Sequence, residues 1–370
     1  VNGGLFIHAQ TEAEYASVMA HELAHLSQRH FARGLEAQQR MQLPMMAAML
    51  AGVVAAAAGA GDAGIAAIVS TQAAAIQAQR RFSRQNEQEA DRIGIVNLER
   101  AGYDPRAMPS MFGRLMRQYR YDQKPPEFLL THPVSESRIA DTTNRAEQYA
   151  QGGTQDSLRY QLMRARTQLK FESTPGVGAK RFRAMLDENP EMDAARYGLA
   201  LAQMKAGQLA DAASSLEPLL AKAPDDLTYN LAQVELDITA NRLQQAQTRL
   251  QRLLQLYPGN YPVRQMHIDL LMERGETQQA ERELDKLAEQ RRRDPDIWYQ
   301  VAEVRGLSGN IVGLHQARAE YFALVGDYDQ GIEQLNLAKR RASNFQISAR
   351  IDARQKQLIE EKRMVEDMLR

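Results

Sequence analysis

The sequence predicts a mainly α-helical protein, in which a helical domain with a small β element precedes an α-solenoid of helix pairs. The first observation is a 34-residue period in the second half of the chain, the length of two packed helices with their turns. The second is the helical spacing of apolar residues between residues 16 and 35. The chain has 370 residues, 44% of them hydrophobic, which is sufficient for two folded domains.

Charge and cysteine content exclude several classes of protein. Lys and Arg number 46 and balance 46 Asp and Glu, so the chain has no net basic field and we expect no nucleic-acid partner. The sequence has no cysteine, which excludes disulfides, thiolate metal sites and a cysteine nucleophile. Any catalysis must therefore use oxygen or nitrogen groups, or a metal held by histidines and carboxylates.

Changes in composition divide the chain into three parts. Residues 1–150 contain five of the seven histidines and an apolar tract rich in Ala, Gly and Met. Residues 151–190 are polar and glycine-punctuated, and we predict a linker with one helix from Leu158 to Phe171. Residues 191–370 form the repeat domain. The chain begins close to a predicted strand, Leu5-Phe6-Ile7, so we expect the first domain to be truncated at its N-terminus.

The repeat domain shows the signature of tetratricopeptide helix pairs, with a small residue where two helices cross and Pro224 or Pro258 at the end of a unit. The positions that recur every 34 residues are Ala212, Ala246 and Ala280, then Leu216, Leu250 and Leu284, and the turn positions Gly207, Asn241 and Gly275. Such solenoids present a concave surface to other polypeptides, so we expect a polypeptide partner. The charged stretch from Asn344 to Arg370 is predicted to cap the stack.

A motif with metal-ligand spacing, His21-Glu22-x-x-His25, lies in a helix predicted from Ala16 to Leu35. Positions i and i+4 share one helix face, so both imidazoles can bind one metal while Glu22 points at a water on it. This is the arrangement of a zincin-type hydrolase, in which zinc lowers the pKa of its water toward about 7 and Glu22 is the catalytic base. The alternative is that both histidines have structural roles.

The third ligand cannot come from the same helix. The metzincin spacing requires a histidine six residues after His25, where the chain has Phe31. His30 lies about 140° around a continuous helix from His25, so we predict that it is a surface or packing residue.

A carboxylate on a second predicted helix remains as the third ligand. Glu87 and Asp91 share a face of that helix, whereas Glu89 points away. We predict Glu87 as the metal ligand and Asp91 as the acceptor that orients a ligand imidazole. The alternative is that these acids only stabilise the N-terminus of their helix.

Three ordered motifs resemble the CAAX-prenyl-protease and HtpX type of zinc metalloprotease. The motifs are His21-Glu22-x-x-His25, then Glu87-x-x-Ala90-Asp91, and then Thr131-His132-Pro133 followed by Arg138. The resemblance implies that His21, His25 and Glu87 hold one Zn²⁺ per chain and that Glu22 is the catalytic base.

The resemblance leaves the roles of the remaining site residues open. His132 either stabilises the oxyanion of the transition state, occupies the fourth position on zinc, or caps the following helix. Arg138 either binds a substrate carbonyl or carboxylate, or forms a salt bridge. The family has a strand whose edge binds the substrate backbone, and Leu5, Phe6 and Ile7 are predicted to be its remnant.

The combination with tetratricopeptide repeats is similar to the soluble periplasmic branch of this family in Gram-negative bacteria. It implies a periplasmic endopeptidase in the quality control and assembly of outer-membrane β-barrel proteins, with those proteins and their assembly machinery as partners. The main alternative is a chaperone or scaffold whose zinc site is latent or structural. An intramembrane prenyl-protein protease is disfavoured because the apolar arms described next are short.

The apolar tract has two arms of about sixteen residues, Met45–Ala60 and Ala63–Ala78. A spanning helix needs about twenty apolar residues, so neither arm is predicted to cross a membrane. We predict a helical hairpin that covers the active-site side. The alternative is that residues 45–78 contact a membrane peripherally.

Overall fold

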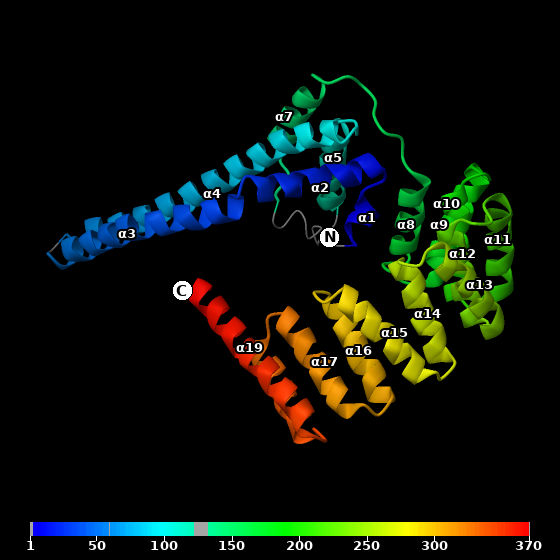
Figure 1. Cartoon of the computed structure of the whole chain (residues 1–370). Coiled ribbons are helices and arrows are strands. Elements are labelled where there is room, and N and C mark those ends of the chain that lie inside the picture. Colours follow the sequence, from blue (N-terminus) through cyan, green and yellow to red (C-terminus); the bar gives the residue numbers. More distant parts are fainter. Residues whose placement is uncertain (1–2, 59, 122–131, 370) are drawn as a thin grey trace. The chain divides into compact units, whose positions relative to one another are not determined.

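The computed structural model describes residues 3–58, 60–121 and 132–369 (Figure 1). Thr131 of the third motif therefore lies outside the described residues. All regular elements in the described ranges are helices, so the mainly α fold class is confirmed. The contacts divide the chain into two compact units, Val1–Gly198 and Leu199–Arg370.

The small β element predicted at the start of the chain is wrong. Leu5, Phe6 and Ile7 belong to the short helix α1 (Leu5–His8). The ring of Phe6 lies 4.7 Å from that of Tyr15 and 5.7 Å from that of Tyr160. A short apolar run is compatible with a strand or with a helical turn. Here, packing against these aromatic rings stabilises the helical turn. No strand edge for a substrate backbone exists at these residues.

The helix that carries the first motif is shorter than predicted. Helix α2 (Glu12–Ser27) begins at Thr11, whose side chain accepts a hydrogen bond from the backbone N–H of Glu14. It ends because Arg29 adopts a left-handed conformation with φ of 54°, and a new helix, α3 (His30–Ala57), begins at the next residue. The predicted continuous helix from Ala16 to Leu35 is therefore broken between its two histidine-containing parts.

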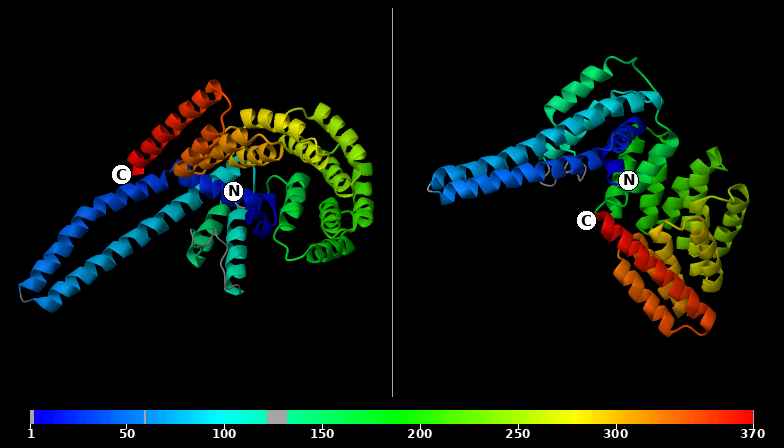
Figure 2. Two further views of the ribbon diagram at one scale, coloured as in Figure 1. Left: turned by 90° about the horizontal axis from the view of Figure 1, so that it is seen from below. Right: turned by 60° about the vertical axis from the view of Figure 1, so that its left-hand side comes forward.

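Helices α3 and α4 (Gly61–Arg100) pack along each other and form the predicted hairpin (Figures 1 and 2). They contain 28 and 40 residues, far more than the sixteen-residue arms of the apolar tract. By length and composition α3 is able to cross a membrane, and only 6% of its most apolar window is buried. The length argument against a spanning helix is therefore wrong for α3.

The base of the hairpin is held by the core of the first unit. Buried side chains of α4 and of α5 (Ala107–Tyr121) form one cluster with Ala20 of α2, and its largest members are Ile95, Leu98, Met108 and Phe112. Helix α2 lies close to α4 at Gly94, where a Cβ atom would lie 3.3 Å from the backbone nitrogen of His21. This close contact brings the first motif next to the second.

The described part of the first unit contains three further helices, and a fourth helix crosses the division between the units. They are α7 (Glu136–Ala146), α8 (Leu158–Gln168), α9 (Pro175–Glu188) and α10 (Asp193–Lys205). Helix α8 agrees with the helix predicted in the linker, whereas α9 occupies a stretch predicted as irregular. Pro175 takes the first position of α9, where proline suits a helix start.

The second unit is the predicted α-solenoid of helix pairs, stacked in chain order (Figure 2). Its helices are α11 (Leu209–Lys222), α12 (Leu227–Thr239), α13 (Leu243–Leu256), α14 (Tyr261–Glu273), α15 (Thr277–Gln290), α16 (Pro295–Leu307), α17 (Ile311–Leu324), α18 (Tyr328–Arg340) and α19 (Phe345–Leu369). The repeated Ala212, Ala246 and Ala280 are fully buried. The turn positions that precede them have positive φ in all three repeats. Helix α19 packs on α18, as predicted for a terminal cap.

Candidate metal centre

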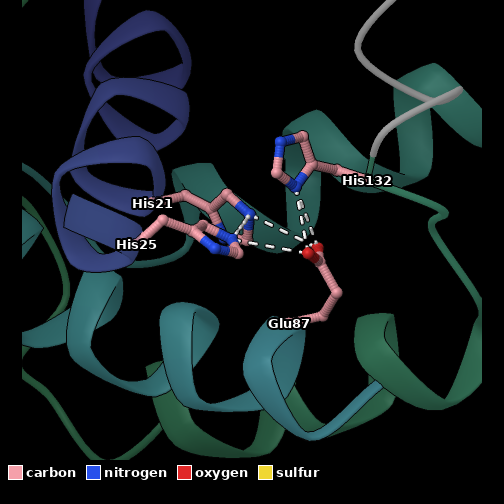
Figure 3. A group of neighbouring side chains, drawn as sticks. All are labelled: His21, His25, Glu87 and His132. Atoms are coloured by element: carbon pink, nitrogen blue, oxygen red, sulfur yellow. Dashed lines mark hydrogen bonds and ion pairs between the residues drawn. The ribbon is translucent and has the colours of Figure 1, made fainter. Parts of the chain in front are cut away.

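Four side chains from three segments meet at one point of the first unit (Figure 3). His21 and His25 come from α2, Glu87 comes from α4, and His132 precedes α7. One ligand atom of each residue lies within 4.8 Å of the ligand atoms of the others. Two imidazoles and a carboxylate are the donor set that zinc takes in catalytic sites, and these residues therefore fit a metal ion.

His21 is fully buried, and its two ring nitrogens have different partners. Nε2 lies 3.5 Å from Oε2 of Glu87, and Nδ1 lies 3.0 Å from Oδ1 of Asp91. Asp91 thus lies where the sequence predicted an acceptor for a ligand imidazole. Burial opposes the charge on Asp91, but hydrogen bonds from Arg138 and His21 lower its pKa below the usual value.

His25 directs Nε2 toward the same point. This atom lies 3.1 Å from Nε2 of His21 and 3.4 Å from Oε1 of Glu87. Burial, reinforced by the positive charge of His21, lowers the pKa of His25 to about 4. The ring is therefore neutral at pH 7, which is the form that binds metals.

Glu87 is charged in spite of its burial. Desolvation would raise its pKa, but hydrogen bonds from His132 and His21 and the charge of Arg138 hold the pKa well below the usual range. A buried carboxylate that stays ionised is suited to bind a cation.

His132 and Glu22 stand on the open side of the cluster. Nδ1 of His132 lies 3.0 Å from Oε1 of Glu87, and its Nε2 lies 3.3 Å from Oε1 of Glu22. The Glu22 side chain is 40% exposed, so it can reach a solvent molecule or a substrate.

Glu22, His25 and His132 also line a cavity of about 1390 Å³ that continues between α3 and α4, along residues 30–45 and 72–87. Much of the rest of its wall is apolar, with Leu26, Phe31, Leu35, Met41, Met45 and Phe82 among the lining residues. Leu5, Phe6 and Ile7, which were predicted to bind substrate, do not line it.

Arg138 forms the salt bridge that was one of its two predicted roles. Its guanidinium donates to both oxygens of Asp91 and to the carbonyl of Pro133, and it lies 3.0 Å from Oε2 of Glu87. The side chain is only 5% exposed. These contacts leave no free face for a substrate carbonyl, so the substrate-binding alternative does not agree with the geometry.

The sequence prediction that His30 faces away from His25 is wrong, whereas Glu89 lies outside the cluster of four donor groups, as predicted. His30 was placed on another side of the helix from His25, yet His30 Nδ1 lies 2.9 Å from His25 Nδ1. Its Nε2 lies 3.2 Å from Oε2 of Glu89. The reason is the break at Arg29, which no glycine or proline marks in the sequence.

Comparisons with known proteins agree with this combination of domains. The sequence profile of peptidase family M48 matches residues 1–146, and that of the tetratricopeptide repeat matches residues 178–234 and 237–303. A solved tetratricopeptide repeat protein from Parabacteroides merdae aligns with 65% of this chain and 96% of its own at 12% identity, with a TM-score of 0.35, too low to carry an argument.

Several curated relatives match nearly the whole chain. The beta-barrel assembly-enhancing protease of Escherichia coli is 37% identical over 366 residues, which cover 97% of this chain and 74% of the relative. The protein of that name from Yersinia pestis is 34% identical over 365 residues, covering 97% and 74%. A mitochondrial metalloendopeptidase of Arabidopsis thaliana is 31% identical over 135 residues, covering 36% of this chain and 25% of its own.

The fold and the cluster define a helical metalloendopeptidase that carries tetratricopeptide repeats. The chain belongs to peptidase family M48, in the group of the β-barrel assembly-enhancing proteases. Membership of this family implies a metal cofactor, and the repeats imply protein substrates or partners.

Proposed function

We propose that this protein is a periplasmic zinc endopeptidase that acts in the assembly and quality control of outer-membrane β-barrel proteins. The convergence of His21, His25 and Glu87 on one point, with Glu22 beside it, carries the enzymatic part of the proposal. The names of the Gram-negative relatives support the substrate class and the compartment. We assign the protease to residues 1–150, the linker to 151–190 and the repeats to 191–370.

His21, His25 and Glu87 would hold one zinc ion per chain. When bound, zinc polarises the scissile carbonyl and makes water acidic enough to be activated near pH 7. Glu22 then accepts the proton of the attacking water and passes it to the leaving amine. Asp91 and Arg138 fix the orientation of His21.

His132 is proposed as a fourth ligand that keeps the enzyme latent. His132 belongs to the cluster of four donor groups, and a site with four protein ligands has no open position for water. Displacement of His132 would then open the site. In this arrangement the protein is a protease whose zinc site is latent until His132 is displaced. While the site is latent, the repeat domain acts as a binding module, as in the predicted scaffold alternative.

The lining of the cavity beside Glu22 is suited to a substrate segment with apolar side chains. Its Leu, Phe and Met side chains can bury apolar side chains of an unfolded polypeptide on one side of the scissile bond. Outer-membrane strands expose apolar side chains on alternate positions before they insert, so a stalled chain has the required chemistry. The repeat domain would recruit such chains or their assembly machinery.

The hairpin is proposed to contact a membrane peripherally through residues 45–78. Leu50 and Val54 are 63% and 67% exposed, and Asp62 is the single charged residue of this stretch. Flotation with vesicles of bacterial phospholipid tests the contact. The intact chain is expected to float and a Leu50→Glu, Val54→Glu variant to stay in the soluble fraction. A chain that stays soluble at all lipid compositions contradicts this part.

Metal analysis tests the proposed zinc centre. The purified protein is expected to contain about one zinc ion per chain, because the cluster supplies one set of ligands. His21→Ala and Glu87→Gln should lose the metal, whereas His8→Ala, which removes a histidine outside the cluster, should keep it. A metal-free protein with a normal fold would contradict the proposed enzyme and favour the alternative of a chaperone or scaffold.

A further inference from the structure

We propose that His30 is a positioning residue for the metal ligand His25, and that Glu89 and Arg33 hold His30 in this role. The inference rests on the proposed function, because it requires a metal at His25. It concerns three residues that the catalytic scheme above does not use.

The two nitrogens of the His25 ring face in different directions. Nε2 faces the Glu87 carboxylate and His21, whereas Nδ1 lies 2.9 Å from Nδ1 of His30. At this distance the two Nδ1 atoms form a hydrogen bond, for which one ring must donate and the other accept.

Metal binding decides the direction of this hydrogen bond. A neutral His25 that binds a metal through Nε2 carries its proton on Nδ1, so His25 donates and His30 Nδ1 accepts. A neutral His30 then has its proton on Nε2, which lies 3.2 Å from Oε2 of Glu89. An ionised carboxylate only accepts, and the same oxygen also accepts from Nη1 of Arg33 at 3.0 Å. Glu89 therefore fixes the tautomer of His30, and His30 fixes the tautomer of His25.

The same logic already operates at the other imidazole of the motif. His21 Nδ1 lies 3.0 Å from Asp91, which in turn accepts from Arg138. Each ligand ring is thus connected to a carboxylate that also accepts a hydrogen bond from an arginine. At His25 a second imidazole is inserted between the ligand and the carboxylate.

The burial of His30 supports a defined role. Its side chain is only 4% exposed, and a buried imidazole is costly unless its polar atoms are hydrogen-bonded. Both of its nitrogens have partners. The left-handed Arg29 breaks the helix between α2 and α3, and His30, the first residue of α3, lies beside the ring of His25.

Loss of His30 removes the acceptor for His25 Nδ1 and leaves the ring free to rotate. Partners of ligand histidines typically contribute a factor of about 10 to 100 in metal affinity. We therefore expect His30→Ala to weaken zinc binding by about tenfold or more.

The test measures the Zn²⁺ affinity of the full chain by competition with a chelator of known affinity. His30→Ala and Glu89→Ala should both weaken binding, the first more strongly. His30→Gln should restore most of the affinity, because a glutamine amide can accept from His25 and donate to Glu89. The matched control is His8→Ala, since His8 lies in α1 and contacts Gln118. Co²⁺ absorption provides a second readout, and the ligand-field band should shift in His30→Ala but not in the control.

Two results overturn the inference. One is a zinc affinity of His30→Ala equal to that of the unchanged protein, and the other is a His30→Gln variant as weak as His30→Ala. If His30→Ala does not fold, the zinc affinities of Glu89→Ala and His30→Gln test the inference. Glu89→Ala should fold, because the Glu89 side chain is 36% exposed and its removal leaves no cavity in the core. An unchanged protein that binds no zinc would instead overturn the proposed function. Normal zinc binding without an effect of His30 overturns only this inference.

Discussion

Arg138 donates two hydrogen bonds of 2.7 Å to the two carboxylate oxygens of Asp91, and Asp91 lies 3.0 Å from Nδ1 of His21. Both side chains of this pair are almost fully buried. The guanidinium also lies 3.0 Å from Glu87. A single arginine therefore orients two of the three proposed metal ligands, one through Asp91 and one directly.

Replacement of Arg138 is expected to weaken metal binding. Arg138→Lys keeps the charge but cannot donate in parallel to both oxygens of Asp91, so zinc affinity should fall by about 10- to 100-fold. Arg138→Ala leaves two buried carboxylates without their partner and should also lower the free energy of unfolding by about 3 kcal/mol or more. Chelator competition and urea unfolding measure the two effects. Unchanged affinity in Arg138→Lys would contradict the positioning role.

His132 can be tested by the direction of the change in activity. If it closes the metal site, His132→Ala should raise the rate of cleavage of a labelled unfolded polypeptide several-fold while zinc stays bound. A loss of activity would instead indicate that His132 stabilises the transition state. An unchanged rate would contradict both roles, and the predicted helix cap is not available because Ser135 caps α7.

Glu14 is expected to make the first unit sensitive to acid. Its buried carboxylate accepts hydrogen bonds from Arg114, Ser110 and the backbone of Gln10. Burial would raise its pKa, but these donors lower it below that of the unfolded chain. The stabilisation is therefore present above about pH 4.5 and is lost as the pH falls through the lower, folded-state pKa.

Glu14→Gln should cost about 2 kcal/mol of unfolding free energy near pH 7, and this difference should shrink in acid. Urea unfolding followed by circular dichroism across pH, with a chelator present throughout, measures the difference without a contribution from metal loss. The exposed Glu36→Gln serves as the control. A difference that stays constant down to pH 3 would contradict the assignment.

The turns of the solenoid require left-handed backbone. Gly275 has φ of 73°, and Asn241 at the equivalent position of the preceding repeat has φ of 57°. Gly275→Ala should therefore destabilise the second unit by about 1 kcal/mol, and Asn241→Gly should leave it unchanged or slightly more stable. The single tryptophan, Trp298 in α16, reports on this unit by fluorescence during urea unfolding. Gly259→Ala is the control, because a Cβ atom there meets no neighbour within 4 Å. Equal losses in Gly275→Ala and Gly259→Ala would contradict the explanation.

The sequence predicted the features that depend on regular spacing. The 34-residue period located the buried Ala212, Ala246 and Ala280, since each must lie where two helices cross. The i, i+4 spacing of His21 and His25 and the shared face of Glu87 and Asp91 were sufficient to predict which side chains converge. These relations follow from helix geometry alone.

The features that the sequence did not predict depend on packing between elements. Leu5, Phe6 and Ile7 fit a strand by composition, and aromatic contacts with Tyr15 and Tyr160 make them helical. The position of His30 depends on one left-handed residue, Arg29, whose side chain gives no signal of a helix break. The length of α3 was underestimated because polar residues near its start interrupt the apolar tract but not the helix.

The central claim is that Glu22 activates water at a metal held by His21, His25 and Glu87. The most direct test is the cleavage of a labelled unfolded polypeptide by Glu22→Gln, with zinc content measured in the same sample. Glutamine keeps the shape of the side chain but cannot accept the proton, so zinc should remain at about one per chain and cleavage should fall by a factor of about 100 or more. Cleavage at the unchanged rate by the zinc-loaded Glu22→Gln protein would contradict the account.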